Sequence, residues 1–112
     1  MIESYSFGQI IINGEKYTSD LIIYKDQVDK DWWRKEGHYL YLEDIQNIIK
    51  EKPEIIIVGT GYYGLMKVDP ALIEYCNSQG IGLIIKKTTE ACSEYNKLAE
   101  NKKVIAALHL TC

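Results

Sequence analysis

Three glycines follow one of the most apolar stretches of the chain. Gly59, Gly61 and Gly64 come directly after the run of Ile and Val at residues 55–58. In dinucleotide-binding domains this spacing lets the main chain approach a pyrophosphate at a helix N-terminus. Here the next helix signal, Asp69-Pro70, comes several residues later, and the acidic residue that binds a ribose is missing. We therefore favour a glycine-rich turn with positive φ over a dinucleotide site.

A second candidate is the segment that holds Trp32, Trp33, Arg34 and His38. Arg34 offers a planar fork for a carboxylate or a phosphate, and His38 can exchange protons near neutral pH. The competing interpretation is structural: Trp33 packs inward, Arg34 pairs with a nearby carboxylate, and His38 bonds a main-chain carbonyl. Because structural ion pairs and satisfied histidines are commoner than functional sites, we favour the structural interpretation.

The cysteines and histidines do not form a metal or disulfide pattern. Cys76, Cys92 and Cys112 are widely spaced, there is no CxxC pair, and the chain has only two histidines. Cys76 and Cys92 fall on apolar helix faces, and we predict that both are buried. A redox role for Cys112 is disfavoured because no cysteine stands beside it to resolve a mixed disulfide. We expect no metal, no cofactor and a reducing, cytoplasmic location.

Length and composition fit a single globular domain. The chain has 112 residues, of which 46% are apolar and 26% charged, and we predict one domain over residues 1–112. The net charge of −3 and the absence of a basic stripe disfavour a nucleic-acid partner. No apolar run approaches the ~18 residues that a membrane helix needs, and we expect no signal peptide. A monomer and a homodimer both remain open.

Patterning in the first third predicts a β-hairpin and a loop. Residues 5–13 and 16–24 are rich in Ile and Tyr, and Asn13-Gly14 between them is a strong hairpin signal. Residues 28–40 have no clear period, and we predict a long ordered loop there.

From residue 42 onward, helices and strands alternate. The first predicted helix has Leu42, Ile45, Ile48 and Ile49 on one face and ends at Pro53. A strand over 55–58 follows, then a helix from Asp69-Pro70 to Gly80 and a strand over 81–85. The last two predicted elements are a helix capped by Thr88 or Thr89 and a strand over 104–110. Apolar strands of this kind are buried on both faces. The pattern therefore predicts a compact three-layer α/β domain with a mixed central sheet, an N-terminal β-hairpin and three helices. The direction of the last strand stays open.

Taken in order, these motifs resemble the Mth-type family of domains of unknown function. The matching stretches are Ser6-Phe7-Gly8, Asn13-Gly14 with Tyr17, Trp33-Arg34 with Gly37-His38, Gly59 to Gly64, Thr88 to Leu98, and Val104 to Cys112. The family includes an adipogenesis-associated Mth domain-containing protein and a mitochondrial complex I assembly factor. The resemblance implies a three-layer α/β fold and a role with protein partners, but no established reaction.

The resemblance also implies one shared cleft, to which the glycine motif, the Trp-Arg loop and the last strand contribute. Its residues in this chain are Trp33, Arg34, Gly37, His38, Gly59, Thr60, Gly61 and Gly64, with Thr88, Asn96 and His109. The family supplies no catalytic residue to transfer, so whether the protein is an enzyme stays undecided.

Two functional hypotheses follow. The first is a small protein-interaction, assembly or regulatory module with an anion-friendly cleft, which contacts its partner through Tyr62-Tyr63 and Trp32. The alternative is a binding protein or enzyme for a small phosphate or carboxylate, in which the Gly59–Gly64 turn and Arg34 hold the anion and His38 transfers a proton. The alternative requires Arg34 and His38 to open onto the same pocket as the Gly61 N–H.

Overall fold

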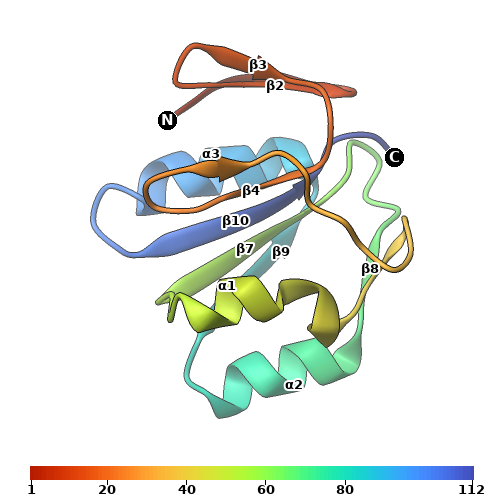
Figure 1. Ribbon diagram of the computed structural model, residues 1–112, viewed down its shortest axis with the longest axis vertical. Helices are drawn as coiled ribbons and strands as arrows, with labels where there is room; N and C mark the ends of the chain where they lie inside the picture. The colour runs from red at the N-terminus through yellow and green to blue at the C-terminus, as the bar shows by residue number, and fades with distance from the viewer.

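A five-stranded mixed sheet forms the middle layer of the protein (Figure 1). In the computed structural model, which describes residues 1–112, the strand order is β5-β4-β10-β7-β9. The strands are β4 (Leu21–Ile23), β5 (Val28–Asp29), β7 (Ile55–Thr60), β9 (Gly82–Lys86) and β10 (Val104–His109). β10 is parallel to β7 and antiparallel to β4, so the mixed sheet is confirmed and the last strand now has a direction.

Helices and smaller sheets cover both faces of the central sheet. A 3-10 turn, η1 (Leu42–Ile45), continues into α1 (Gln46–Lys50), which lies with α2 (Pro70–Ser78) on one face (Figure 1). On the other face lie α3 (Thr88–Leu98) and an antiparallel sheet of β1 (Ile2–Ser6), β2 (Gln9–Ile12) and β3 (Glu15–Tyr17). A short parallel pair, β6 (Tyr39–Leu40) and β8 (Lys67–Val68), completes the fold. The three-layer prediction is confirmed. None of the helices is long and apolar enough to cross a membrane.

Strand alternation divides the apolar interior into two clusters. In β7, Ile57 packs toward α3 and the small sheet, whereas Ile56 and Val58 pack toward α1 and α2. β4 and β10 alternate in the same way. Each isoleucine buried in this manner contributes roughly 1.5–3 kcal/mol. Cys92 lies in the first cluster and Cys76 in the second, so the prediction that both are buried is confirmed.

The N-terminal region has more strands than the sequence pattern indicates. The predicted strand over 5–13 is interrupted by a turn at Gly8, whose φ is +80°. The predicted strand over 16–24 divides after Tyr17, because β4 leaves the small sheet and joins the central one. All three residues of β4 are buried, which a strand covered on both faces requires. The turn at Asn13-Gly14 between β2 and β3 is confirmed, with φ of 48° and 83°.

Two further expectations need correction. The predicted loop over 28–40 contains β5 and β6. Helix α3 has Lys87 at its N-cap position, and neither threonine caps it. The reason is that Thr88 is already helical, and its hydroxyl is used elsewhere. In α2, by contrast, Asp69 caps the helix as predicted, since its side chain accepts a hydrogen bond from the Ala71 N–H.

Candidate functional site

The carboxyl ends of β7 and β10 lie side by side, and the candidate residues gather around them. Beyond these strands, residues 61–65 bind the segment after β10: the Tyr62 N–H donates to the Thr111 carbonyl (2.7 Å) and the Leu65 N–H to the Cys112 carbonyl (3.0 Å). Gly61 lies at the crossing with φ of +108°. A Cβ there would lie 2.6 Å from the Cys112 oxygen and 2.8 Å from Cδ2 of His109. Only glycine fits this position.

A largely buried ionic cluster lies beneath this crossing and consists of Asp20, Arg34 and His109. Oδ2 of Asp20 is 2.8 Å from Nη2 of Arg34 and 2.7 Å from Nδ1 of His109. Oδ1 of Asp20 accepts the Leu110 N–H at 2.7 Å. Arg34, whose side chain is 6% exposed, also donates to the Gly37 carbonyl at 2.9 Å. One carboxylate therefore fastens the 32–38 segment to the end of β10.

The cluster keeps the Asp20 carboxyl group ionised. Burial alone would raise the pKa of Asp20, but hydrogen bonds from His109, the Leu110 N–H and Arg34 outweigh it and lower this pKa to about 2. Because the ionised carboxylate can only accept, Nδ1 of His109 carries the proton that lies between them. Nε2 of His109 and Nε of Arg34 are buried without a hydrogen-bond partner.

The groups expected to hold an anion are engaged within the protein. The Gly61 N–H donates to Oγ1 of Thr88 (2.9 Å), and that hydroxyl donates to the His109 carbonyl (2.6 Å). Nη2 of Arg34 is paired with Asp20. An anion that used either donor would have to displace an internal partner.

The other glycine-motif residues have packing roles at the same place. A Cβ on Gly59 would lie 2.8 Å from Oγ1 of Thr88, and the Thr60 hydroxyl donates to the Lys86 carbonyl at 3.1 Å. Gly64 has φ of +72° and lies against the Lys87 side chain. The exposed His38 ring is 5.7 Å from the His109 ring, edge to face. The structure therefore brings most of the predicted residues together.

Three residues lie elsewhere than expected. Trp33 does not pack inward; it is 77% exposed. Trp32 packs instead: its Nε1 donates to the Asp44 carbonyl at 3.2 Å, and the Arg34 guanidinium stacks 4.6 Å from its ring centre. Trp32 is therefore not part of an exposed contact surface, contrary to the prediction. Its ring packs against Arg34, which turns inward to reach Asp20. Asn96 lies apart from the cleft, where its amide bonds both the N–H and the carbonyl of Ile2.

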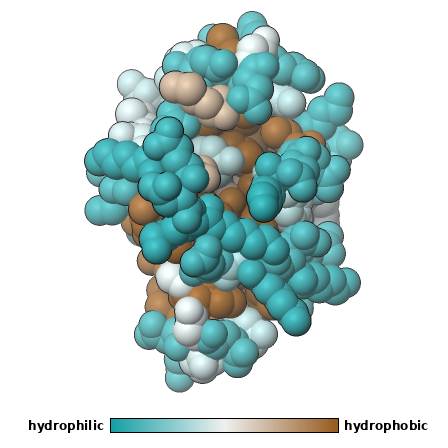
Figure 2. Space-filling model, turned by 90° about the vertical axis from the view of Figure 1, so that its left-hand side faces the viewer, coloured by the Kyte–Doolittle hydropathy of each residue, from teal (hydrophilic) through white to brown (hydrophobic).

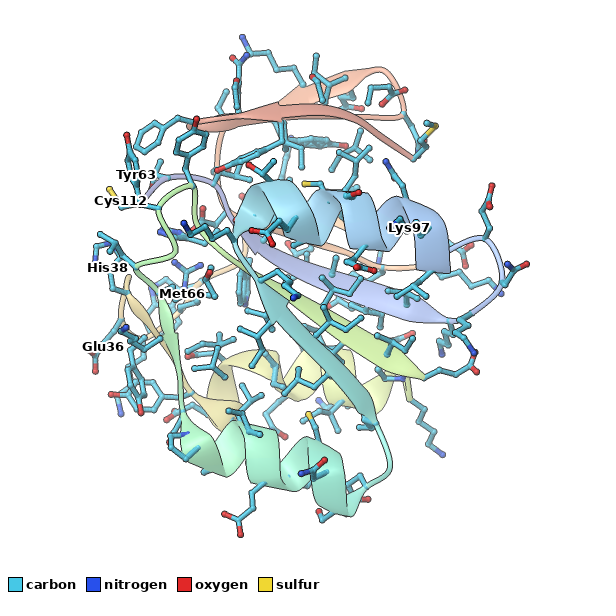
Figure 3. All side chains as sticks on the ribbon, turned by 180° about the vertical axis from the view of Figure 1, so that it is seen from behind. Glu36, His38, Tyr63, Met66, Lys97 and Cys112 are labelled. Atoms are coloured by element: carbon cyan, nitrogen blue, oxygen red, sulfur yellow. The ribbon has the colours of Figure 1, made fainter.

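An exposed aromatic patch lies at the same end of the central sheet as the ionic cluster. We define it as Phe7, Tyr62, Tyr63 and Leu65, which are 49%, 43%, 61% and 50% exposed. Phe7 is 6.0 Å from both tyrosine rings, and the two tyrosine rings are 5.1 Å apart. Figure 3 shows Tyr63 beside Cys112, with His38 below them. The patch joins the β1–β2 turn to the glycine loop.

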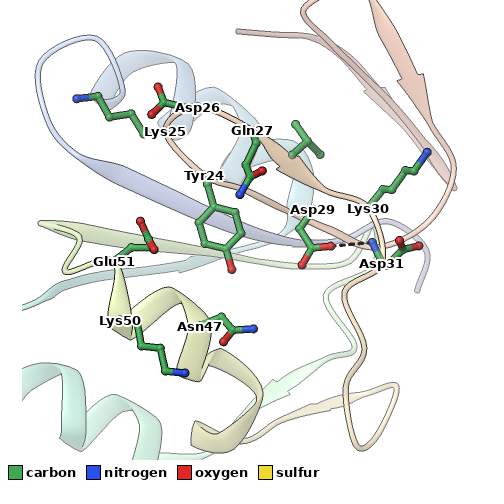
Figure 4. A pocket seen from close by; sticks show the side chains of 11 residues that line it. Tyr24, Lys25, Asp26, Gln27, Asp29, Lys30, Asp31, Asn47, Lys50 and Glu51 are labelled. Carbon is green, nitrogen blue, oxygen red and sulfur yellow. Dashed lines mark hydrogen bonds between the residues drawn. The ribbon is translucent and has the colours of Figure 1, made fainter.

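Two polar grooves lie at a different place, along the β5 edge of the central sheet. One, of about 600 Å³, is bounded by residues 24–31 and by Asn47, Lys50 and Glu51 of the α1 region (Figure 4). The other, of about 350 Å³, includes Trp32 and Trp33. A view from the side of the β4–β5 turn shows a mainly hydrophilic surface with apolar residues in its hollows (Figure 2). Neither groove contains the glycine motif or Arg34.

Sequence reasoning missed two residues of this region. Asp20, the centre of the ionic cluster, stands in an ordinary polar stretch, and its partners are 14 and 89 residues away in the sequence. No local pattern could have found it. Phe7 precedes Gly8 in an otherwise strand-like run, so a turn assigned to that glycine would have placed Phe7 on the surface.

Comparison with known proteins agrees with the resemblance. The family described as "protein of unknown function (DUF498/DUF598)" matches residues 2–109. A Xenopus tropicalis protein named NADH dehydrogenase [ubiquinone] 1 alpha subcomplex assembly factor 3 is 27% identical over 110 residues, which cover 95% of this chain and 58% of that protein. The chain thus spans somewhat over half of this relative's length.

Solved structures share the fold over the whole chain. A conserved hypothetical protein, PH1505, from Pyrococcus horikoshii has a TM-score of 0.85 and 26% identity, with 100% of this chain and 99% of that one covered. A Mth938-like domain from Bordetella pertussis has a TM-score of 0.64 and 18% identity over 98% of this chain and 85% of that one. The Mth-type resemblance is confirmed.

Proposed function

We propose, from the premise that this chain belongs to the DUF498/DUF598 family of proteins of unknown function, that it is a protein-interaction module used in assembly or regulation. The observation that carries this proposal is the aromatic patch. It contains four of the seven large apolar side chains that the surface exposes. The relative named as an assembly factor supports the same role. We also expect a cytoplasmic location, as the cysteine pattern predicts.

The exposed apolar area of the patch and the rigidity of its loop both favour a contact site. Large apolar side chains left in water forgo roughly 1.5–3 kcal/mol each, so their gathering on one surface favours a contact site. Tyrosine and phenylalanine are also enriched in protein interfaces, and tyrosine is among the residues that dominate binding energy. Main-chain bonds to Thr111 and Cys112 hold the loop that carries Tyr62 and Leu65. A rigid loop loses little entropy when a partner binds.

Affinity capture with quantitative mass spectrometry tests the proposal. Wild-type protein, the double variant Tyr62→Glu/Tyr63→Glu and the control Trp33→Glu are used as baits under identical conditions. We expect the double variant to lose the partners that the wild type enriches, while its melting temperature stays unchanged. The Trp33 variant should keep them, since that exposed ring lies outside the patch. Equal enrichment by the double variant would refute the proposal.

A second candidate, binding of a small phosphate or carboxylate, has one specific observation in its favour. The Nε–H of Arg34 is a buried donor without a hydrogen-bond partner, and buried polar groups are ordinarily satisfied. A ligand at about 100 times its Kd adds ~2.7 kcal/mol of stability. A thermal-shift screen of nucleotides, sugar phosphates, carboxylates, sulfate and divalent metals tests this. A shift of several degrees that His38→Ala reduces would support the candidate, and a flat screen would remove it.

A further inference from the structure

We infer that the aromatic patch docks a short segment of a partner protein that carries a large apolar side chain followed or preceded by a carboxylate. This inference rests on the proposed interaction function and specifies its partner. Three features of the patch support it: its area, its ring geometry and its neighbouring charge.

The area of the patch suits a short segment better than a second copy of the chain. Its four side chains are each about half exposed. At roughly 200 Å² for a fully exposed side chain of this size, they offer on the order of 400 Å². A stable interface between two folded proteins buries about 800 Å² on each partner. The patch therefore offers about half of the area that each partner in a stable dimer buries. This area is enough to cover two or three anchoring side chains of a peptide.

Ring geometry favours an apolar anchor. The tyrosine rings meet at 83°, and Phe7 meets Tyr62 at 73°, both edge to face. Centre separations of 5.1 and 6.0 Å mean that these rings contact one another. No gap is left between them in which a cation could lie sandwiched, as it does in an aromatic cage. The faces and edges that remain exposed suit a Leu, Phe or Trp side chain.

The charge beside the patch is positive and unpaired. The Lys87 stem lies against Gly64, with Cγ 3.1 Å and Cε 3.4 Å from the position a Cβ would take there. None of the ion pairs in the protein involves Lys87. In a chain of net charge −3, a lysine beside an apolar patch favours a partner that brings a carboxylate.

The neighbouring sheet edge is blocked to strand addition at its start. β1 is an edge strand, and edge strands commonly accept an added strand. Here the Asn96 amide occupies both the N–H and the carbonyl of Ile2, at 2.9 and 2.8 Å. A strand added at this position would have to displace Asn96.

Selection from a display library of random 12-residue peptides tests the inference. Peptides are selected on the wild type and counter-selected on Tyr63→Ser. We expect enriched peptides to combine Leu, Phe or Trp with a nearby Asp or Glu. In fluorescence polarisation, Tyr63→Ser should weaken a selected peptide about tenfold or more. Lys87→Ser should weaken it severalfold, with the effect reduced in high salt, and Trp33→Ser should leave it unchanged.

Four outcomes would overturn the inference. Enriched peptides could lack carboxylates or bind Tyr63→Ser as well as the wild type. The library could yield no enrichment over the counter-selection. Sedimentation could reveal a dimer that Tyr63→Ser dissociates, which would make a second copy the occupant. If any of these occurs while affinity capture still depends on Tyr62 and Tyr63, the interaction proposal survives and only this description of the partner fails.

Discussion

The ionic cluster and the aromatic patch lie at the same end of the central sheet, and each reverses the usual distribution of residues. Asp20, Arg34 and His109 are charged or polar groups turned inward. Phe7 and Tyr63 are large apolar groups turned outward. Charged groups are seldom buried without partners, whereas isolated apolar groups are often exposed.

The two regions differ in the contacts that their side chains make. In the ionic cluster, Asp20 accepts hydrogen bonds from both Arg34 and His109, and the cluster joins segments from three parts of the chain. The rings of the patch contact mainly one another. We conclude that the cluster holds the fold together at this end and that the patch is available for another molecule. Changes in the cluster should therefore destabilise the protein, and changes in the patch should not.

Removal of the Asp20 carboxylate should cause the largest loss of stability. Asp20→Ala leaves the buried Arg34 guanidinium without its counter-ion, and breaking a buried pair in this way costs about 3–5 kcal/mol. Urea unfolding measures the difference. The control is Lys35→Ala, which removes the exposed pair with Glu43 and should change the free energy of unfolding by less than about 1 kcal/mol. If both variants lose the same small amount, the cluster does not hold the fold.

Gly61→Ala should be the next most damaging change. The new Cβ would combine a strained backbone, at φ of +108°, with a clash against His109 and the Cys112 main chain. We expect a loss of roughly 2–4 kcal/mol. Gly14→Ala is the matched control, since Gly14 has φ of +83° and no atom within 4 Å of its Cβ position. Its loss should be only ~1–2 kcal/mol, and equal melting temperatures would show that the clash at Gly61 relaxes without cost.

Acid should weaken the cluster by a smaller amount. The folded state lowers the pKa of Asp20 from 3.8 to about 2. The resulting stabilisation is therefore present above pH ~4 and is lost as the pH falls toward 2. Allowing for solvent screening at a partly exposed carboxylate, we expect roughly 1–2 kcal/mol. Urea midpoints between pH 5 and pH 2 should fall less steeply for Asp20→Asn than for the wild type. Parallel curves would contradict this role for the carboxylate.

Changes in the patch should scarcely affect stability. Tyr63→Ser and Phe7→Ser remove side chains that are about half exposed or more, so each should shift the free energy of unfolding by at most about 0.5 kcal/mol. Thermal and urea unfolding provide the measurement. A loss above 2 kcal/mol in either variant would mean that the patch belongs to the core, and the contrast with the ionic cluster would disappear.

Local patterns in the sequence predicted most of the fold. The apolar run at residues 55–58, the Asp69-Pro70 helix start and the Asn13-Gly14 turn each depend on neighbours a few residues away. Their physical causes are burial on both faces, capping and positive φ, and the residue types report all of these directly.

The candidate site was less predictable, because its contacts join distant parts of the sequence. The grouping of Arg34, His38, Gly61 and His109 followed from the family resemblance, and the structure places these residues together. The opposite orientations of Trp32 and Trp33 depend on Asp20, which carries no local signal. Whether these residues bind a ligand stays a prediction for the thermal-shift screen.

The position of β10 has a consequence for how the protein is made. β10 lies between β4 and β7, yet it is synthesised more than 80 residues after β4. At about 5–20 residues per second, translation leaves the apolar β4 without one of its two neighbouring strands for on the order of 4–16 s. The strands of the central sheet therefore cannot pair one after another in the order of their synthesis. The sheet closes only after residues 104–109 are available, and until then one side of Leu21–Ile23, a segment that is buried in the folded protein, stays unpaired.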